Sequence, residues 1–175
     1  MSVIISQEQK GFMKGRYIGE NIRTIYDVIH QANEKEVPGL LLLVDFEKAF
    51  DTISRNFIVK CLEILGFGQS IIQWIETFFN NSCARILHNG YTSRTIKVSR
   101  GTRQGDPISS FLFVIGAQIL NYLYQQNKNI KGIVVKDKEH KILQFADDTE
   151  FFLDGSEKSF QATLETLTES KKYLD

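Results

Sequence analysis

The chain has few of the residues that interrupt or cross-link a fold. Its 175 residues include only two prolines and two cysteines. Cys61 and Cys83 lie far apart in the sequence, and neither belongs to a CxxC pair. We therefore expect neither a disulfide framework nor a zinc site, and we interpret both cysteines as reduced core thiols of an intracellular protein.

Signals for a membrane are scarce as well. No stretch approaches the roughly 20 consecutive apolar residues that a membrane-spanning helix needs. The N-terminus, MSVIISQEQK, has no basic region followed by a long apolar run, so no secretory signal is expected. The sequence therefore predicts no membrane partner and an intracellular location, with nucleus and cytoplasm both open.

An excess of charge is also absent, because 21 basic residues balance 21 acidic ones. The distribution is nevertheless uneven, since no acidic residue lies between Glu76 and Asp106. A basic strip of this kind could follow a phosphate backbone, or it could be the solvated face of a hairpin. The strip comprises Arg85, Arg94, Lys97, Arg100 and Arg103.

The composition, 42% hydrophobic and 24% charged, is typical of one globular domain with a core. The apolar run at 39–46 predicts a strand buried on both faces, and Trp74 is expected in the core. Short hairpin connections predict an α+β fold in which a mostly antiparallel sheet packs against helices. Apolar spacing and turn residues predict helices at 19–35, 54–65, 69–80, 107–126 and 156–173, and hairpins at 84–99, 132–145 and around 145–148.

Three carboxylates occupy unusual places. Asp45 ends the apolar run, and Asp147 and Asp148 sit between the apolar stretches ILQFA and FFL. Adjacent buried carboxylates repel each other unless a cation such as Mg²⁺ neutralises them. If the two segments meet, they could hold two metal ions about 3.5–4 Å apart. The alternative is that these residues only form a turn and cap a helix.

Four segments together resemble a known family. LLLVDFEKAFD (41–51), RGTRQGDPIS (100–109) and FADD (145–148) are similar, in order and spacing, to the palm motifs of reverse transcriptases, most of all the non-LTR (LINE-type) enzymes. GFMKGRYIGENI (11–22) resembles the segment before that palm. The resemblance covers nearly the whole chain and implies an RNA-directed DNA polymerase. It implies transfer of a dNTP to a DNA primer on an RNA template, with two Mg²⁺ ions or Mn²⁺ in their place.

The resemblance assigns roles by position. Asp45 and Asp147 match the catalytic metal ligands, and Asp148 matches the less essential carboxylate beside them. The backbone carbonyl of Phe46 would be an additional ligand. Phe50 matches the aromatic residue under the incoming sugar, where its ring would clash with a 2′-hydroxyl and favour dNTP over NTP.

In the second motif, Gln104 and Gly105 match the pair that contacts the incoming nucleotide and the template, and Arg103 could contact phosphate. The family usually has Ser-Pro where this chain has Ser109 and Ser110, which alters the start of the following helix. Template or triphosphate contacts are predicted for Lys14, Arg16 and Arg23.

The same resemblance divides the chain into a partial fingers segment, 1–38, and an incomplete palm, 39–175. The family continues with a thumb, and LINE-type proteins carry an endonuclease elsewhere in a larger polyprotein. The fragment alone is therefore expected to polymerise poorly.

Three other functions are alternatives to this one. The fold could persist as an inactive or domesticated nucleic-acid-binding remnant. An RNA-directed RNA polymerase would favour glycine before the paired aspartates and a residue smaller than Phe50. A two-metal nuclease lacks support, because no additional acidic or histidine cluster is present.

Overall fold

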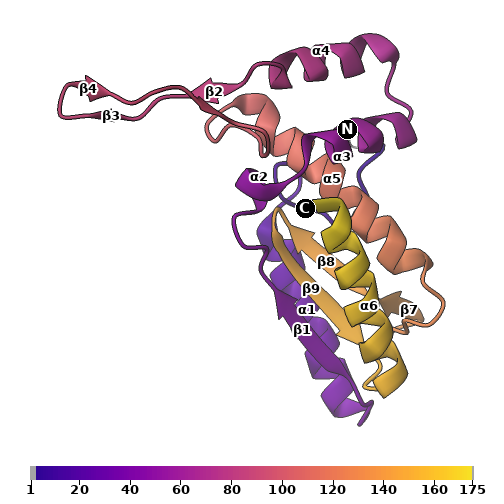
Figure 1. The fold of residues 1–175 in the computed structure, drawn as a ribbon. Coiled ribbons are helices and arrows are strands. Elements are labelled where there is room, and N and C mark those ends of the chain that lie inside the picture. The colour runs from indigo at the N-terminus through magenta and orange to yellow at the C-terminus, as the bar shows by residue number, and fades with distance from the viewer. Residues whose placement is uncertain (1–2, 175) are drawn as a thin grey trace.

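A computed structural model describes residues 3–174, and its α+β architecture agrees with the prediction (Figure 1). The helices are α1 Ile18–Glu34, α2 Ala49–Thr52, α3 Arg55–Ile64, α4 Gln69–Phe79, α5 Pro107–Gln126 and α6 Glu157–Leu174. The strands are β1 Leu40–Val44, β2 Cys83–Ala84, β3 Leu87–His88, β4 Tyr91–Thr92, β5 Ile96–Lys97, β6 Ile133–Val135, β7 Lys138–His140, β8 Ile142–Phe145 and β9 Asp148–Leu153.

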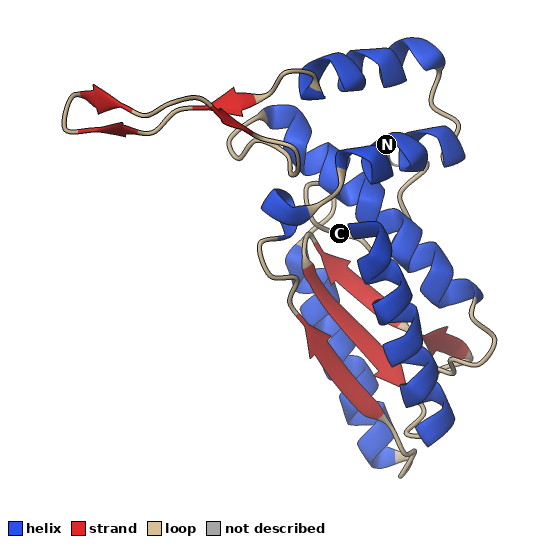
Figure 2. Cartoon of the chain, viewed as in Figure 1, coloured by secondary structure: helices blue, strands red, loops and turns tan. Residues whose placement is uncertain are grey.

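Strands β1, β9 and β8, in this order, form a three-stranded antiparallel sheet. Helix α6 covers one face and α1 the other (Figures 1 and 2). Successive strand residues point to opposite faces, so Phe151 of β9 packs beside Tyr124 of α5, while Phe152 packs with Val28 of α1. The sheet is therefore held between two helical layers.

The burial predicted for the apolar run at 39–46 and for Trp74 is wrong. Strand β1 pairs with β9 only and forms an edge of the sheet, and Leu43 keeps 68% of its surface exposed. The apolar run is thus not buried on both faces. Trp74 is 73% exposed, because α4 turns Ile72 and Ile75 into the core and leaves Trp74 on the opposite side.

Helix α5 runs through the core, where it contacts both α3 and α6. It starts at a polar cap, where the Asp106 carboxylate accepts a hydrogen bond from the Ile108 N–H at 3.1 Å, and Pro107 follows the cap. By length and composition this helix could cross a membrane, contrary to the expectation from the sequence. More than half of its apolar window is buried inside the protein, as in the core helix of a globular fold.

An arm formed by residues 83–97 projects from the body as two short antiparallel pairs, β2 with β5 and β3 with β4 (Figure 1). The predicted turn is confirmed, since Asn89 and Gly90 both have positive φ angles, 48° and 82°. Arg55 holds the base of the arm, because its guanidinium donates to the carbonyls of Phe79 at 3.0 Å and Val98 at 2.8 Å.

The two cysteines differ in their surroundings, so only one of them is the core thiol that was predicted. Cys61 is fully buried, and burial raises its pKa to about 12, whereas Cys83 is exposed. At pH 8 we expect iodoacetamide to modify Cys83, while the thiolate fraction of Cys61 is about a thousand-fold lower than that of an unperturbed thiol. Peptide mass spectrometry checks this, and both thiols should react in denaturant. Equal modification of the two in native buffer would contradict the fold.

Candidate active site

The turn between β8 and β9 presents two of the predicted carboxylates. Phe145 pairs with Asp148, so Ala146 and Asp147 form a two-residue connection. Ala146 has a φ of 58°, a region that glycine usually occupies at such a turn. A non-glycine residue held there stores strain of about 1–3 kcal/mol. The turn places Asp147 at its tip and Asp148 at the first position of β9.

Asp45 reaches the same end of the sheet from the neighbouring strand. Val44 pairs with Thr149, so Asp45 leaves β1 at the level of Asp148. Partial burial raises the pKa of Asp148 above its usual value, and the negative charges of Asp147 and Asp45 raise it further. The three carboxylates that the sequence singled out therefore lie close enough to repel one another.

A fourth acidic group, which the sequence did not single out, extends this negative surface. Glu150 lies two residues after Asp148 and points to the same face of β9. Burial, followed by the charge of Asp148, raises its pKa to about 7. One of its carboxyl oxygens has no hydrogen-bond partner in the described structure. Pairing between β1 and β9 could have identified Glu150, but no motif in the sequence does.

The chemistry of this end of the sheet suits a hard divalent cation, which prefers carboxylate and carbonyl oxygens. Among the residues whose side chains are described, 3–171, no ion pair joins Asp45, Asp147 or Asp148 to a lysine or arginine. In the same part of the chain, no three acidic, histidine or cysteine side chains are arranged as a finished metal site. The pairing of β1 with β9 brings the carboxylates to one end of the sheet, and the repulsion between like charges opposes their convergence on one point. The carbonyl of Phe46 accepts the Ala49 N–H at 3.2 Å, which leaves one of its lone pairs for another partner.

Three of the residues predicted to bind nucleotide line one pocket of about 420 Å³. Phe50 forms part of its wall and stacks on Phe113 with ring centroids 4.7 Å apart. Gln104 and Gly105 complete the predicted trio, whereas Arg103 is exposed and is not among the lining residues.

Backbone hydrogen bonds attach the loop at 101–105 to helix α2. The Thr102 N–H donates to the carbonyl of Phe50 at 2.7 Å. Gly101 has a φ of 74°, and a Cβ there would lie 2.6 Å from the carbonyl oxygen of Asp51, so glycine is required. The Gln104 side-chain amide donates to the Asp51 carboxylate at 3.2 Å, which orients Gln104. Sequence reasoning missed this role of Asp51, because the two residues lie in different motifs.

A larger hollow of about 590 Å³ adjoins the carboxylates between the β1–α2 connection and helices α5 and α6. Asp45, Phe46 and Ala146 form part of its wall, together with apolar side chains of α5. Asp147 and Asp148 are not among its lining residues. Asp45 therefore faces an open space rather than packed protein.

The three basic residues assigned to template or triphosphate have different surroundings. The half-buried guanidinium of Arg16 donates to the carbonyls of Ile5 at 2.9 Å and Gln9 at 2.6 Å, and also to that of Ser6. Arg16 therefore holds the N-terminal segment in place. Lys14 and Arg23 are exposed, and Arg23 lies 3.9 Å from Asp27 of the same helix. Nucleic-acid contacts by these residues stay a prediction.

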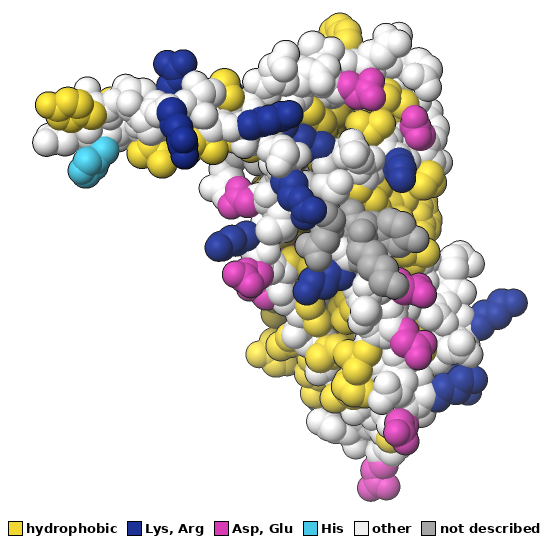
Figure 3. All heavy atoms as spheres, viewed as in Figure 1, with side chains coloured by type: hydrophobic (Ala, Val, Ile, Leu, Met, Phe, Trp, Pro, Cys, Tyr) yellow, Lys and Arg dark blue, Asp and Glu magenta, His cyan; other side chains and the backbone are white. Residues whose placement is uncertain are grey.

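The basic strip lies largely on the projecting arm, where Lys and Arg side chains line the surface (Figure 3). Arg85, Arg94 and Lys97 are all exposed there. Tyr91, next to the Asn-Gly turn, keeps 82% of its surface accessible. The arm thus offers exposed positive charge and an aromatic ring, the two features that single-stranded nucleic acids bind.

Known proteins match nearly the whole chain. The family described as "Reverse transcriptase (RNA-dependent DNA polymerase)" matches residues 1–174. The chain is 29% identical over 169 residues to the Pol polyprotein of a type-1 retrotransposable element R2 from Popillia japonica, covering 95% of the chain and 23% of that protein. It is 25% identical over 150 residues to the uncharacterized 149 kDa protein of transposon TX1 from Xenopus laevis, and the match covers 85% of the chain and 11% of that protein. It is 24% identical over 147 residues to the Pol polyprotein of type-2 retrotransposable element R2DM from Drosophila melanogaster, and the match covers 83% of the chain and 14% of that protein. The chain therefore spans less than a quarter of the length of each of these three relatives.

Proposed function

Because the chain belongs to the reverse transcriptase (RNA-dependent DNA polymerase) family and is distantly related to Pol proteins of R2 elements, we propose that it carries the palm site of an RNA-directed DNA polymerase from a non-LTR retrotransposon. In the proposed reaction, the 3′-hydroxyl of a primer attacks the α-phosphate of a dNTP. A new phosphodiester bond forms and pyrophosphate leaves. The observation that carries the proposal is the placement of Asp45 beside the Asp147–Asp148 turn.

Four residues are assigned to metal binding in this proposal. Asp45, Asp147, Asp148 and the carbonyl of Phe46 would hold Mg²⁺, or Mn²⁺ in its place, as two ions. When bound, the metal activates the attacking hydroxyl and stabilises the leaving pyrophosphate. The chain's own residues place the reactants, and orientation of this kind supplies a large part of the rate enhancement.

The pocket beside Phe50 would receive the sugar and phosphates of the dNTP. The stack on Phe113 opposes movement of the ring, which would therefore clash with a ribose 2′-hydroxyl. Gln104, oriented by Asp51, and Gly105 would contact the nucleotide and the template, with Arg103 at the phosphates. Template sequence would be read by base pairing rather than by the protein.

We further propose that residues 1–38 belong to the fingers and that residues 39–175 form the palm. The Pol relatives named above are several times longer than this chain. The rest of such a polyprotein would supply a thumb to grip the RNA template and DNA primer. An endonuclease elsewhere in that polyprotein belongs to the same proposal. The isolated chain is expected to extend primers poorly.

The direct test uses the chain joined to its thumb, an RNA template with an annealed DNA primer, and Mg²⁺. We expect dNTP incorporation that stops on addition of EDTA and resumes when Mg²⁺ is restored in excess. Preference for NTPs would instead support an RNA-directed RNA polymerase. Template binding without incorporation would support the inactive or domesticated nucleic-acid-binding remnant.

The arm is expected to contribute to RNA affinity through its charge. Replacing Arg85, Arg94 and Lys97 together by glutamine should weaken binding and reduce the slope of log affinity against log salt by about 2, since each lost phosphate contact removes about 0.7 on a single strand. Fluorescence anisotropy of a labelled RNA, measured at several salt concentrations, gives this slope.

A matched control removes the same charge elsewhere. Lys128, Lys136 and Lys138 are exposed at and near the β6–β7 hairpin, and their replacement by glutamine should leave the slope nearly unchanged. If both triple variants lose affinity equally, only the net charge of the protein counts and the arm has no special role.

A further inference from the structure

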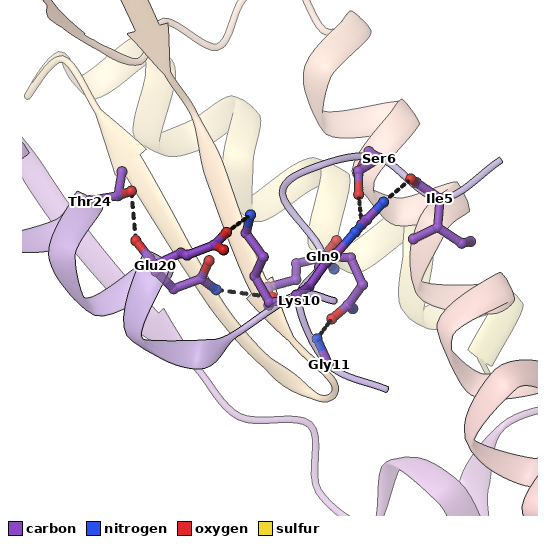
Figure 4. A network of polar contacts seen from close by, with 10 residues as sticks. Ile5, Ser6, Gln9, Lys10, Gly11, Glu20 and Thr24 are labelled. Carbon is purple, nitrogen blue, oxygen red and sulfur yellow. Dashed lines mark hydrogen bonds and ion pairs between the residues drawn. The ribbon is translucent and has the colours of Figure 1, made fainter. Parts of the chain in front are cut away.

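Gln9 lies far from the carboxylates in sequence, yet its side chain contacts the turn that carries two of them. It is 1% exposed, and its amide brackets the backbone of Ala146. The Gln9 Oε1 accepts the Ala146 N–H at 2.9 Å, and the Gln9 Nε2 donates to the Ala146 carbonyl at 3.3 Å. The same Oε1 also accepts the Gly11 N–H at 2.8 Å (Figure 4).

The backbone around Gln9 is fixed to the sheet, which keeps the base of the Gln9 side chain close to Ala146. Gln9 bridges Gln144 in parallel register, with the Lys10 N–H donating to the Gln144 carbonyl and the Gln144 N–H to the Glu8 carbonyl, both at 2.9 Å. Arg16 ties the segment from its other side, as described above. The contact is close, because a Cβ on Gly11 would lie 2.2 Å from the Ala146 nitrogen.

The held residue is the strained one. Ala146 has a positive φ and immediately precedes Asp147, so any relaxation of Ala146 would rotate the carboxylates of the turn. An amide is suited to hold it, since one end accepts a hydrogen bond while the other donates one. Asparagine and glutamine carry such an amide, and glutamine has the longer reach.

We propose that Gln9 is a positioning residue, which clamps Ala146 and thereby sets the orientation of Asp147 and Asp148 toward Asp45. The inference rests on the proposed function, in which these carboxylates hold the catalytic metal. The rival interpretation is that Gln9 merely satisfies buried backbone groups. Loss of Gln9 would then affect stability but not the turn or the turnover of folded protein.

The test replaces Gln9 with methionine, which has similar length and no hydrogen-bonding amide, in the full-length protein that contains this chain. In metal-free protein, amide hydrogen exchange at Ala146 should accelerate by about ten-fold, as expected for one lost hydrogen bond. In the loaded enzyme, kcat for dNTP incorporation should fall by about ten- to a hundred-fold, with a smaller change in KM, because the reacting groups are misplaced.

The matched control is Gln118→Met. Gln118 is equally buried, and its Oε1 accepts the Ser6 N–H at 2.8 Å, so it supports the same segment without touching the turn. We expect a similar loss of thermal stability, with exchange at Ala146 and kcat both unchanged. Equal effects of the two variants on exchange and kcat would overturn the proposal, as would wild-type exchange and kcat in Gln9→Met.

A second variant tests the strain itself. Ala146→Gly removes the penalty for a positive φ, so in the Gln9→Met background it should restore part of kcat. Absence of any rescue would contradict the role of strain.

If Gln9→Met is unfolded by circular dichroism, Gln9→Glu carries the same comparison, because it keeps an acceptor for the Ala146 N–H and loses the donor. The two claims can fail separately. If the wild-type protein incorporates no dNTP but Gln9→Met still accelerates exchange at Ala146, the proposed function is wrong, while the role of Gln9 in holding Ala146 is supported.

Discussion

Asp45→Asn and Asp147→Asn are each expected to lower dNTP incorporation by at least about a thousand-fold, which corresponds to the loss of about 4 kcal/mol of transition-state stabilisation. Asparagine keeps the shape of the side chain but removes the charge that holds a cation. Since these carboxylates repel each other in the metal-free protein, the variants should be at least as stable as the wild type. Loss of activity without loss of stability separates a functional carboxylate from a structural one.

Single-turnover primer extension on an RNA template measures the rate, and thermal unfolding measures stability. Asp137→Asn is the matched control, because Asp137 is an exposed carboxylate in the β6–β7 turn with a φ of 65°, which asparagine tolerates. Asp148→Asn should lose less activity than the other two, as its position in the motif implies. A near-normal rate in Asp45→Asn or Asp147→Asn would remove the mechanism.

Phe50→Ala is expected to reduce the preference for dNTP over NTP by about ten- to a hundred-fold, because a steric clash of this kind discriminates by about 1–3 kcal/mol. The ring of Phe50 lines the pocket with Gln104 and Gly105, and its stack on Phe113 keeps it there. Without the ring, the space that a ribose 2′-hydroxyl needs becomes available. The measurement is the ratio of kcat/KM for a dNTP and the matching NTP.

This ratio cancels any destabilisation that truncation of Phe50 causes, because both substrates meet the same folded fraction. Phe12→Ala provides the control. Phe12 packs edge-on against Phe50 at 6.1 Å but does not line the pocket. It should change stability and leave the ratio nearly constant. An unchanged ratio in Phe50→Ala would mean that Phe50 is only a packing aromatic.

Local features of this fold were predictable because their causes are local. The Asn89-Gly90 turn follows from the ability of these two residues to adopt positive φ. The start of α5 follows from Asp106 as a cap and Pro107 in the first turn. The bounds of α3, α4 and α5 lie within about two residues of the prediction, as expected for patterns whose period is read along the chain.

Burial was less predictable, because it depends on which distant segment covers a residue. Leu43 and Trp74 are apolar and belong to regular apolar patterns, yet both are mostly exposed. Cys83 was expected in the core and lies instead at the foot of the exposed arm. Arg16 is a charged residue of the kind expected at the surface, yet its half-buried guanidinium donates hydrogen bonds to backbone carbonyls of its own segment.

By itself, the sequence determined the class of fold, the order of the motifs and the identity of the carboxylates, because these depend on residue type and spacing. Only the tertiary structure decided that β1 lies beside β9, which brings Asp45 to Asp148 across about a hundred residues. The same holds for the hydrogen bonds from Gln9 to Ala146, which join residues 137 positions apart. Such contacts arise from pairing between strands and from packing of a folded segment, and neither leaves a periodic signal in the chain.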